Sequence, residues 1–277
     1  MEETMTPGEE QKSTSNLEKA LASTEADAMN TQKALHLVGL ALKKYLNATK
    51  IGNLKEIQTA INEVEKSELA LRQQVAVTKE GWNFDIDAYL GGSDFIKEIL
   101  AVAEQKGVRI FERDDRLYCY PVLVRVLPSE RTVLIDKAKE KRLRPTVLVN
   151  RLKELQKKPP RFRPDIFLEA LHSAYRKAAQ IKGTHDKNSA DAGTVISLLD
   201  IYELFTLLPG QSKEYSRQEF ARDIFLLDRS GVNETKDGAK LSLPASTGTK
   251  IASRTLNIIN EFGEEKRYYG IAFTKEQ

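Results

Sequence analysis

The stretch "VISLLDIYELFTLLPGQSKEYSRQEFARDIFLLDRSG", Val195–Gly231, decides the fold expected for the C-terminal part of this chain. It holds the end of a short β-like run, "TVIS", then a very apolar helix over 198–208, and Pro209-Gly210 breaks the pattern. Ser216 and Glu219 have the spacing of a capping box, in which each side chain accepts from the other residue's backbone N–H. Gly231 supplies the left-handed residue that commonly ends a helix. The stretch therefore predicts a second helix over 216–230.

The elements around this stretch extend the pattern. "RPDIFLEALHSAYRKAAQ" before it has helical spacing, and "AKLSLP", "TLNIIN" and "KRYYGIAF" after it are strand-like, with "EFGEE" as the last turn. The order helix, short strand, helix, turn, helix, hairpin resembles that of winged-helix modules, many of which bind DNA. The resemblance covers residues 164–277 and rests on element order. It implies a winged-helix-like domain over 161–277.

The central part of the chain combines one helix with short strands. A helix begins after Ser93 and ends before Gly107. Alternating apolar residues then predict an antiparallel β-meander with strands at 108–112, 117–120, 122–127 and 131–135. A further helical pattern follows, and Pro159-Pro160 ends it. We therefore expect a central α/β domain over 81–160.

The N-terminal part predicts a disordered tail over 1–15 and a coiled-coil-like helical hairpin over 16–80. Two seams with steps of four and three residues lie on either side of the polar break "NATKIGN". The hairpin packs against the rest of the chain or docks a protein partner through 17–77. The first seam is Leu17, Leu21, Thr24, Ala28, Thr31, Leu35, Val38, Leu42 and Tyr45, and the second is Leu54, Ile57, Ile61, Val64, Glu68, Leu71 and Val75.

Positive charge is concentrated ahead of the double proline. The whole chain carries +3, but residues 136–163 hold eleven basic and three acidic residues, a local net charge of +8. Such a block is typical of phosphate contact, because each neutralised phosphate releases condensed counterions. The alternative is a solvated helix face. The candidate nucleic-acid contacts in this segment, 137–163, are Lys137, Lys139, Lys141, Arg142, Arg144, Arg151, Lys157, Lys158, Arg161 and Arg163.

The helix over 216–230 offers a second set of contacts. With Phe220, Ile224 and Leu227 facing inward, the outward side would present Arg217, Gln218 and Arg222 along with Ala221 and Phe225. Arginine and glutamine can make bidentate contacts with purines. The turn "EFGEE" between the last two predicted strands is acidic, with Glu261, Glu264 and Glu265, and would repel phosphates. The helix could instead be scaffold or a partner surface.

Signals of catalysis are weak. His36, His172 and His185 lie far apart, and Cys119 falls inside a strand-like run, as a buried structural thiol would. "STGTK", residues 246–250, lacks the setting of a phosphate loop. The carboxylate groups Asp85/Asp87, Asp114/Asp115 and Glu264-Glu265 keep a metal-dependent nuclease as an alternative. We expect no enzyme, no cofactor and no metal.

The expected fold class is α+β, with an N-terminal helical hairpin, a central helix plus antiparallel β-meander, and a C-terminal winged-helix-like domain. No run of 18 apolar residues occurs and the N-terminus is polar, so we expect a cytoplasmic protein with no membrane contact. The expected function is a non-catalytic accessory or adaptor subunit of a larger, ATPase-driven or antiviral complex, which binds nucleic acid, preferably double-stranded DNA. The alternative is a pure protein-interaction subunit, and the second alternative is the nuclease.

Overall fold

The computed structural model describes residues 16–113, 116–181, 193–244 and 254–275. The protein is mixed α+β, as predicted, with long N-terminal helices and antiparallel sheets in the C-terminal half. It divides into two compact units. The N-terminal unit is Met1–Gly107, Val126–Val133 and Lys139–Arg151, and the C-terminal unit is Val108–Arg125, Leu134–Ala138 and Leu152–Gln277. These units differ from the expected boundaries at 80/81 and 160/161, because residues of the central strands belong to both.

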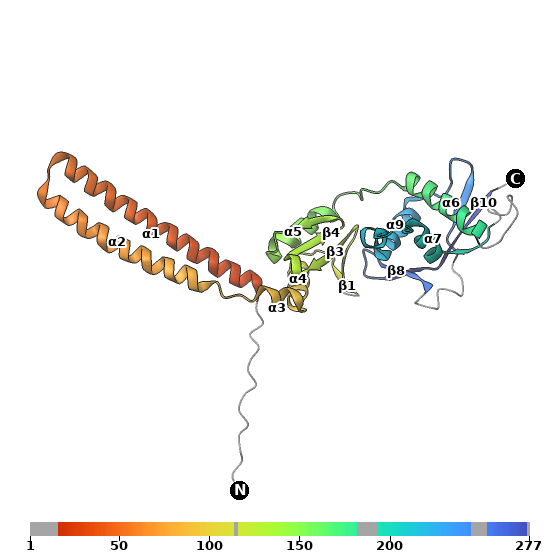
Figure 1. Ribbon diagram of the computed structural model, residues 1–277, viewed down its shortest axis with the longest axis horizontal. Coiled ribbons are helices and arrows are strands. Elements are labelled where there is room, and N and C mark those ends of the chain that lie inside the picture. The colour runs from red at the N-terminus through yellow and green to blue at the C-terminus, as the bar shows by residue number, and fades with distance from the viewer. Residues whose placement is uncertain (1–15, 114–115, 182–192, 245–253, 276–277) are drawn as a thin grey trace, which may run out of the picture. The chain divides into compact units, whose positions relative to one another are not determined.

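The predicted hairpin is formed by α1 (Leu17–Ile51) and α2 (Leu54–Gly81), which lie side by side (Figure 1). Asn16 and Asn53 cap the two helices by accepting from backbone N–H groups three residues on. Gly52 has φ 70° and ends α1 in the left-handed conformation that glycine adopts without strain. The predicted tail over 1–15 lies outside the described residues.

The helix–helix seam is shifted from the prediction by one residue in several turns. Ala41 and Ala48 of α1 and Ala60 of α2 are buried, whereas Leu42 and Ile61 are exposed. Small residues at the contact allow two helices to approach closely, and this excludes the larger neighbours from the seam. The predicted seam was therefore wrong at six positions that the structure leaves exposed: Ala28, Leu35, Leu42, Leu54, Ile61 and Val75.

The rest of the N-terminal unit contains α3 (Ile86–Gly91), α4 (Asp94–Gln105), the 3-10 turn Pro128–Glu130 and most of α5 (Pro145–Gln156). Phe95 and Ile99 of α4 and Leu148 and Val149 of α5 are buried. The Tyr89 ring is also buried and meets Phe95 edge-on, with centroids 5.8 Å apart. The predicted helix after Ser93 is confirmed.

Two carboxylates tie α1 to the other helices of this unit. Glu98 of α4 accepts from the backbone N–H groups of Leu17 and Glu18 at 2.9 and 3.0 Å, and also from the Tyr89 hydroxyl. Glu18 in turn accepts from the backbone N–H of Thr146 at 3.0 Å, at the start of α5. Each carboxylate thus satisfies N–H groups that a helix start leaves without an intrahelical partner.

Replacing Glu18 by glutamine is expected to destabilise the protein by about 1–2 kcal/mol, because a capping carboxylate is lost. Partial burial alone would raise the pKa of Glu18, but hydrogen bonds from Thr146 and Arg144 hold it below the usual value. The stabilisation is therefore present above about pH 4.5 and is lost as pH falls through the folded-state pKa. Urea unfolding of wild type and Glu18→Gln at several pH values measures this. The exposed carboxylate of Glu104 is the control, and an equal effect of Glu104→Gln would contradict the prediction.

A five-stranded sheet follows α4 with its strands in sequence order. These strands are β1 (Phe111–Arg113), β2 (Arg116–Cys119), β3 (Val122–Leu127), β4 (Thr132–Ile135) and β5 (Ala138–Glu140). The predicted meander is confirmed, with β3 matching its predicted bounds. β5 was not predicted, because "AKE" is too short and polar to give a strand signal.

The C-terminal unit also holds a group of helices: α6 (Pro164–Ile181), α7 (Leu198–Phe205), α8 (Gln211–Glu214) and α9 (Arg217–Ser230). They accompany an antiparallel sheet in the order β6-β10-β7, formed by Ile196–Ser197, Gly270–Lys275 and Ala239–Ser242. A separate hairpin pairs β8 (Leu256–Ile259) with β9 (Glu265–Tyr268). The run "KRYYGIAF" was predicted as one strand, but the chain changes sheet after Tyr268, so the run forms most of β9 and most of β10.

The helix α9 is the centre of this unit's core. The capping box of Ser216 and Glu219 is present, and Gly231 ends the helix with φ 74°, both as predicted. Ala221 and Phe225, which the sequence placed on the outward side, are buried. Phe225 packs edge-on against Tyr120, with centroids 5.8 Å apart. The prediction of an open face on α9 was therefore wrong at these positions, because residues distant in sequence cover it.

Candidate functional site

Three of the basic residues predicted to contact nucleic acid already form ion pairs in the N-terminal unit. The Lys139 ammonium lies 2.6 Å from Glu130, and Arg142 lies 2.7 Å from Glu140. Arg144 bridges Glu18 and Glu25, at 2.6 Å to each. Hydrogen bonds from Arg142 lower the pKa of Glu140 to about 2. These cations are already matched by carboxylates of the chain.

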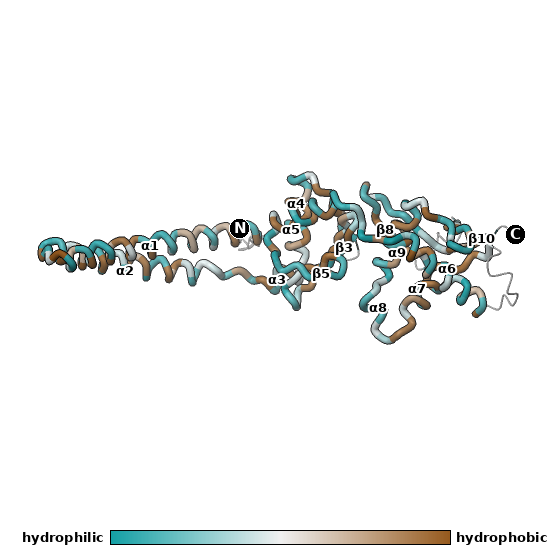
Figure 2. Tube along the Cα trace, turned by 90° about the horizontal axis from the view of Figure 1, so that it is seen from above, coloured by the Kyte–Doolittle hydropathy of each residue, from teal (hydrophilic) through white to brown (hydrophobic). Residues whose placement is uncertain are grey.

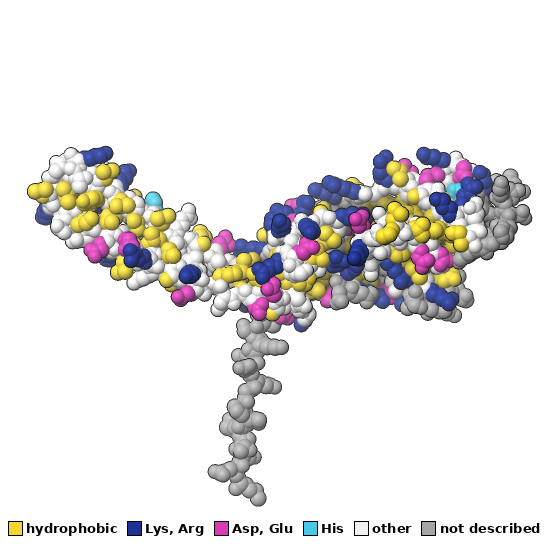
Figure 3. Space-filling view, in the orientation of Figure 1, with side chains coloured by type: hydrophobic (Ala, Val, Ile, Leu, Met, Phe, Trp, Pro, Cys, Tyr) yellow, Lys and Arg dark blue, Asp and Glu magenta, His cyan; other side chains and the backbone are white. Residues whose placement is uncertain are grey.

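The other basic residues of the segment are divided between the two units. Lys141 is exposed and Arg151 half-buried in the N-terminal unit. The C-terminal unit holds the exposed side chains of Lys137, Lys157, Lys158, Arg161 and Arg163. The basic residues of the segment therefore do not all belong to one compact unit. Figure 3 shows basic and acidic side chains interspersed over the visible face.

The candidate contacts on α9 are also engaged. The Arg217 guanidinium donates to the Thr255 carbonyl at 2.7 Å, and Gln218 is half-buried. Arg222 is the clear correction, because its guanidinium donates to both Asp136 and Asp223. A recognition side chain has to reach a base edge from an open face. Arg222 instead holds the interior of the unit together.

The Arg222 network is half-buried and closely connected. Its Nε and Nη2 lie 3.1 and 2.9 Å from Asp223 Oδ1, and the Tyr215 hydroxyl donates to Asp223 Oδ2 at 2.8 Å. The backbone N–H of Leu123 donates to Asp136 at 3.0 Å. Burial raises the pKa of Asp223 despite Arg222 beside it, and burial next to Asp223 also raises the pKa of Tyr215.

A pocket of about 280 Å³ lies beside this network, entirely within the C-terminal unit. Strands β2, β3 and β4 supply one part of its lining, and α8 with the start of α9 supplies another. The pocket is lined by Arg116, Leu123, Val124, Arg125, Leu134, Asp136, Lys137, Lys213, Glu214, Ser216 and Glu219.

Four cations line the pocket: Arg116, Arg125, Lys137 and Lys213. Within the described residues none of them forms an ion pair. Arg116 lies 3.5 Å from the Ser216 hydroxyl, and the Lys137 ammonium lies 5.8 Å from the centroid of the Tyr215 ring. Arg125, Lys137 and Lys213 are exposed. The four side chains therefore keep donors available to an anion.

Two of the three carboxylates in the lining already accept hydrogen bonds from the protein. Asp136 accepts from Arg222 and from the backbone of Leu123. Glu219 accepts from the backbone and hydroxyl of Ser216, at 2.7 and 2.8 Å. Glu214 is exposed. The donors of the lining thus outnumber its open carboxylates, an arrangement suited to phosphate oxygens, which accept charge-assisted hydrogen bonds.

Sequence reasoning identified one of the four cations, Lys137, and missed the other three. Arg125 alternates with the buried Val124 on β3, and this exposed position carries little information by itself. Arg116 follows two residues outside the described part of the chain, and Lys213 belongs to the short helix α8. No local pattern connects these residues, because the fold brings together three segments that lie far apart in the sequence.

The carboxylates considered for a nuclease have structural partners where the structure describes them. Asp85 caps α3, and Asp87 receives two hydrogen bonds from Arg131, at 3.1 and 2.9 Å. Asp114/Asp115 and the run 246–250 lie outside the described residues. Across residues 16–113, 116–181, 193–244 and 254–275, no group of three His, Cys, Asp or Glu residues is placed to hold a metal ion.

The histidines do not form a common site among the described residues. His36 is exposed on α1, whereas His172 is buried on α6, with its ring centroid 4.6 Å from that of Phe273 and its Nδ1 3.8 Å from Asp237. His172 is therefore a core side chain. His185 lies outside the described residues.

Cys119 is expected to react very slowly with thiol reagents in the native protein. Its side chain is fully buried, and burial raises the pKa of the thiol to about 12. The reactive thiolate is therefore scarce at neutral pH. Absorbance of a released aromatic thiol with and without denaturant measures this, and rapid native labelling would contradict it.

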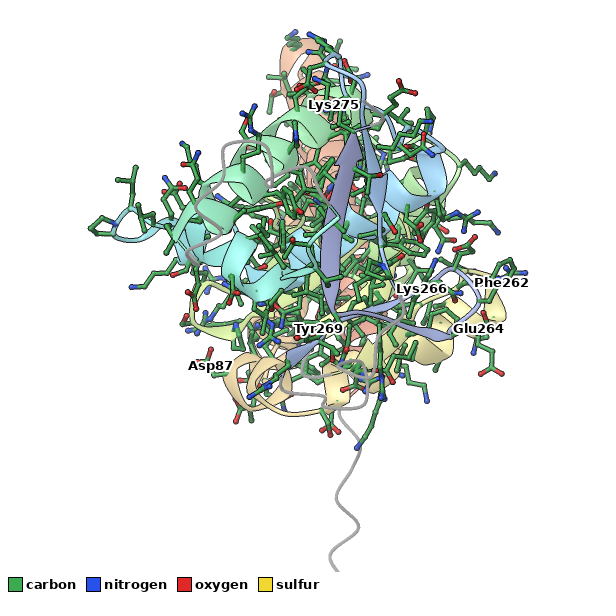
Figure 4. All side chains as sticks on the ribbon, turned by 90° about the vertical axis from the view of Figure 1, so that its right-hand side faces the viewer. Asp87, Phe262, Glu264, Lys266, Tyr269 and Lys275 are labelled. Atoms are coloured by element: carbon green, nitrogen blue, oxygen red, sulfur yellow. The ribbon has the colours of Figure 1, made fainter. Side chains whose placement is uncertain are left out.

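The acidic turn of the β8–β9 hairpin is partly neutralised. Glu265 pairs with Arg267 and Arg113, both at 2.9 Å, and these contacts lower its pKa to about 2. Figure 4 shows Phe262 and Glu264 at the end of this hairpin. The Phe262 ring is exposed and the Arg109 guanidinium lies over it. The turn does not present a basic edge to a phosphate backbone.

None of the helices in the described segments is both long and apolar enough to span a bilayer. In comparisons with known proteins, no family model, no curated protein and no solved structure matches this chain.

Proposed function

We propose that this protein is a non-catalytic, nucleic-acid-binding accessory subunit that contacts phosphates through its C-terminal unit. The contact surface is the pocket with Arg116, Arg125, Lys137 and Lys213. The exposed cations Lys157, Lys158, Arg161 and Arg163 of the same unit are further candidate contacts. Double-stranded DNA is the preferred ligand, and the larger complex is an ATPase-driven or antiviral assembly.

The observation that carries this proposal is a set of four cations around one pocket that have no carboxylate partner in the part of the chain that the structure describes. Surface lysines and arginines elsewhere in the chain are often paired, as at Lys139, Arg142 and Arg144. Unpaired cations that converge on a concavity concentrate positive potential where an anion can enter. A phosphate group there would meet several donors at once.

The winged-helix resemblance supports the proposal through the arrangement of elements. Strand β6, between α6 and α7, pairs with β10, and β10 pairs with β7 after α9. The β8–β9 hairpin is inserted between β7 and β10, where a wing would lie. In this proposal α9 is scaffold rather than a reading helix, because Phe225 and Arg222 are engaged inside the unit.

The rival function is a pure protein-interaction subunit, whose basic pocket receives an acidic side chain or chain terminus of a partner. The same cations suit both ligands, since carboxylates and phosphates both accept charge-assisted hydrogen bonds. The regular spacing of phosphates distinguishes them, because it engages several cations together and gives a steep salt dependence.

The test is fluorescence anisotropy of the full chain with random-sequence duplex DNA between 50 and 200 mM salt. Four phosphate contacts predict a slope of log affinity against log salt near −3.6, a fall of roughly 100-fold over this range. Single-stranded DNA and duplex RNA are measured in parallel to establish the preferred ligand. Absence of binding at the lowest salt would contradict the proposal and favour the rival. Magnesium-dependent nicking of plasmid DNA would instead favour the nuclease.

A further inference from the structure

The helical hairpin leaves an unusual amount of apolar surface exposed. Figure 3 shows hydrophobic side chains over much of its visible face, and Figure 2 shows apolar turns along both helices. Contiguous apolar patches on soluble proteins commonly mark interaction surfaces. The exposed large hydrophobic residues of the hairpin are Met29, Leu35, Leu37, Leu40, Leu42, Leu46, Ile51, Leu54, Ile61, Leu69, Val75 and Val77.

Helix α1 carries two adjacent apolar seams rather than one, and α2 carries part of a second seam. In α1, Ala34, Ala41 and Ala48 face α2, while Leu35 and Leu42, each one residue later, are exposed. In α2, Ala60 is buried and Ile61 is exposed. The same face of α2 also carries the charged residues Glu65, Glu68 and Arg72, so its second seam is mixed. A helix with one neighbour needs one seam, and a helix with two neighbours in a bundle needs two. The hairpin has the pattern of half a bundle.

The second seams of α1 and α2 lie on the same face of the hairpin. In an antiparallel pair, the residue after a seam position rotates toward the same side on both helices, and the residue before it rotates toward the other side. The ion pair of Lys44 with Glu63, 2.9 Å long, agrees with this geometry. These two residues directly precede Tyr45 and Val64 of the seam, and they bridge the helices on the opposite side. The second-seam face carries Leu35, Leu42, Leu46, Leu54, Ile61 and Val75.

Gly39 leaves an open position on this face. It lies between Leu35 and Leu42 on the second seam of α1, and a Cβ added there would meet nothing within 4 Å. Glycine destabilises a helix interior relative to alanine, so its presence in the middle of α1 calls for a reason. A second helix that crosses here could come nearer than it could over any other residue.

We propose that a second copy of this chain covers the face. The two hairpins pack by two-fold symmetry into a four-helix bundle, with α1 of one copy antiparallel to α2 of the other. This inference goes beyond the proposed function and does not depend on it. In this arrangement the second copy, and not a different protein, occupies this face of the hairpin. The same surface of both copies then forms the interface, as is usual in two-fold symmetric dimers.

Charge favours a second copy, because the cations of α1 would meet the carboxylates of α2. Lys43 flanks the second seam of α1, and Glu65 lies on the second seam of α2. Neither residue has an ion-pair partner within the described segments. The pairing of α1 with the second copy's α2 brings these two residues to the same level. A pairing of α1 with α1 would instead bring Glu65 and Glu68 of the two α2 helices together.

The area is also sufficient. The face between residues 28 and 49 of α1 is about 32 Å long, and two helices side by side are about 20 Å wide. Each copy would therefore bury roughly 600 Å², or about 1,200 Å² in total, which reaches the range of specific protein–protein interfaces.

The test is sedimentation equilibrium of the full chain over a range of concentrations, with two matched variants. Leu35 and Leu37 are 59% and 57% exposed on the same helix, but Leu37 lies off the second seam. We expect a dimer of the 31.2 kDa chain, with Leu35→Glu raising its Kd at least 100-fold and Leu37→Glu raising it less than 3-fold. Circular dichroism of both variants establishes that the helices remain folded. A monomer at about 100 μM, or equal effects of the two variants, would overturn the proposal.

Two further measurements establish which helices meet. Lys43→Glu and Glu65→Lys should each weaken the dimer, and the double variant should recover most of the loss. Mixed chains carrying Leu46→Cys or Ile61→Cys should form an inter-chain disulfide, because these two positions lie at the same level in this arrangement and the native Cys119 is buried. Leu37→Cys mixed with Ile61→Cys is the control. Equal cross-linking in the control, or no recovery in the double variant, would overturn this arrangement.

Discussion

Reversing two charges at the pocket, Lys137→Glu with Lys213→Glu, is expected to lower the affinity for random duplex DNA on the order of 10- to 100-fold. Both ammonium groups line the pocket and are exposed, so each substitution removes one phosphate contact and adds one repulsive charge. The slope of log affinity against log salt should become shallower by about 2. Fluorescence anisotropy at several salt concentrations measures both quantities.

The matched control is Lys33→Glu with Lys66→Glu on the hairpin. These lysines are exposed, and the double substitution changes the net charge of the chain by the same amount. Affinity should stay within about 3-fold of wild type, because neither lysine lines the pocket or belongs to the unit that holds it. If the control weakens binding as much as the pocket variant, net charge rather than the pocket governs binding.

A second comparison concerns the segment that the sequence favoured. Lys141→Glu with Arg142→Glu is expected to weaken DNA binding less than the pocket variant, because Arg142 already pairs with Glu140. A larger loss for this variant would move the contact surface to the N-terminal unit. The sequence alone could not make this distinction, because the +8 segment contains paired and unpaired cations without any local difference between them.

Local patterns were enough to predict most individual elements. The hairpin, the strand Val122–Leu127, the capping box at Ser216 and the stop at Gly231 each depend on residues within a few positions of one another. Such signals act through backbone hydrogen bonds and helix periodicity, which the sequence states directly. Fold class followed from the order of these elements.

The pairing of elements was much harder to predict. The burial of Phe225 depends on Tyr120, and the engagement of Arg222 depends on Asp136, 86 residues away. In the hairpin, both Ala41 and Leu42 fit a heptad seam, and the choice between them is made by how closely the helices approach. The candidate site was hard to predict for the same reason, because Arg116, Lys137 and Lys213 come from separate segments of the chain.

Arg222→Met is expected to destabilise the protein by about 3–5 kcal/mol, because it leaves the partly buried carboxylates of Asp136 and Asp223 without their cation. Guanidinium chloride unfolding measures the change in free energy. The control is Arg229→Met, which removes the more exposed ion pair with Glu261 and should cost no more than about 1 kcal/mol. Equal losses would show that Arg222 contributes as a surface charge.

Neutralising the two carboxylates distinguishes the loss of their cation from a loss of packing as the cause of the destabilisation. Arg222→Met combined with Asp136→Asn and Asp223→Asn should recover part of the stability, because the carboxylates are then neutral. The pH dependence gives a second readout. Burial already raises the pKa of Asp223 in the wild type, and without Arg222 that pKa must rise further. The stability of Arg222→Met is then favoured at low pH and falls as pH rises through the folded-state pKa, so its deficit should be larger at pH 7 than at pH 4. A deficit that does not change with pH and is not recovered by the two asparagines would mean that lost packing, rather than stranded charge, causes the loss.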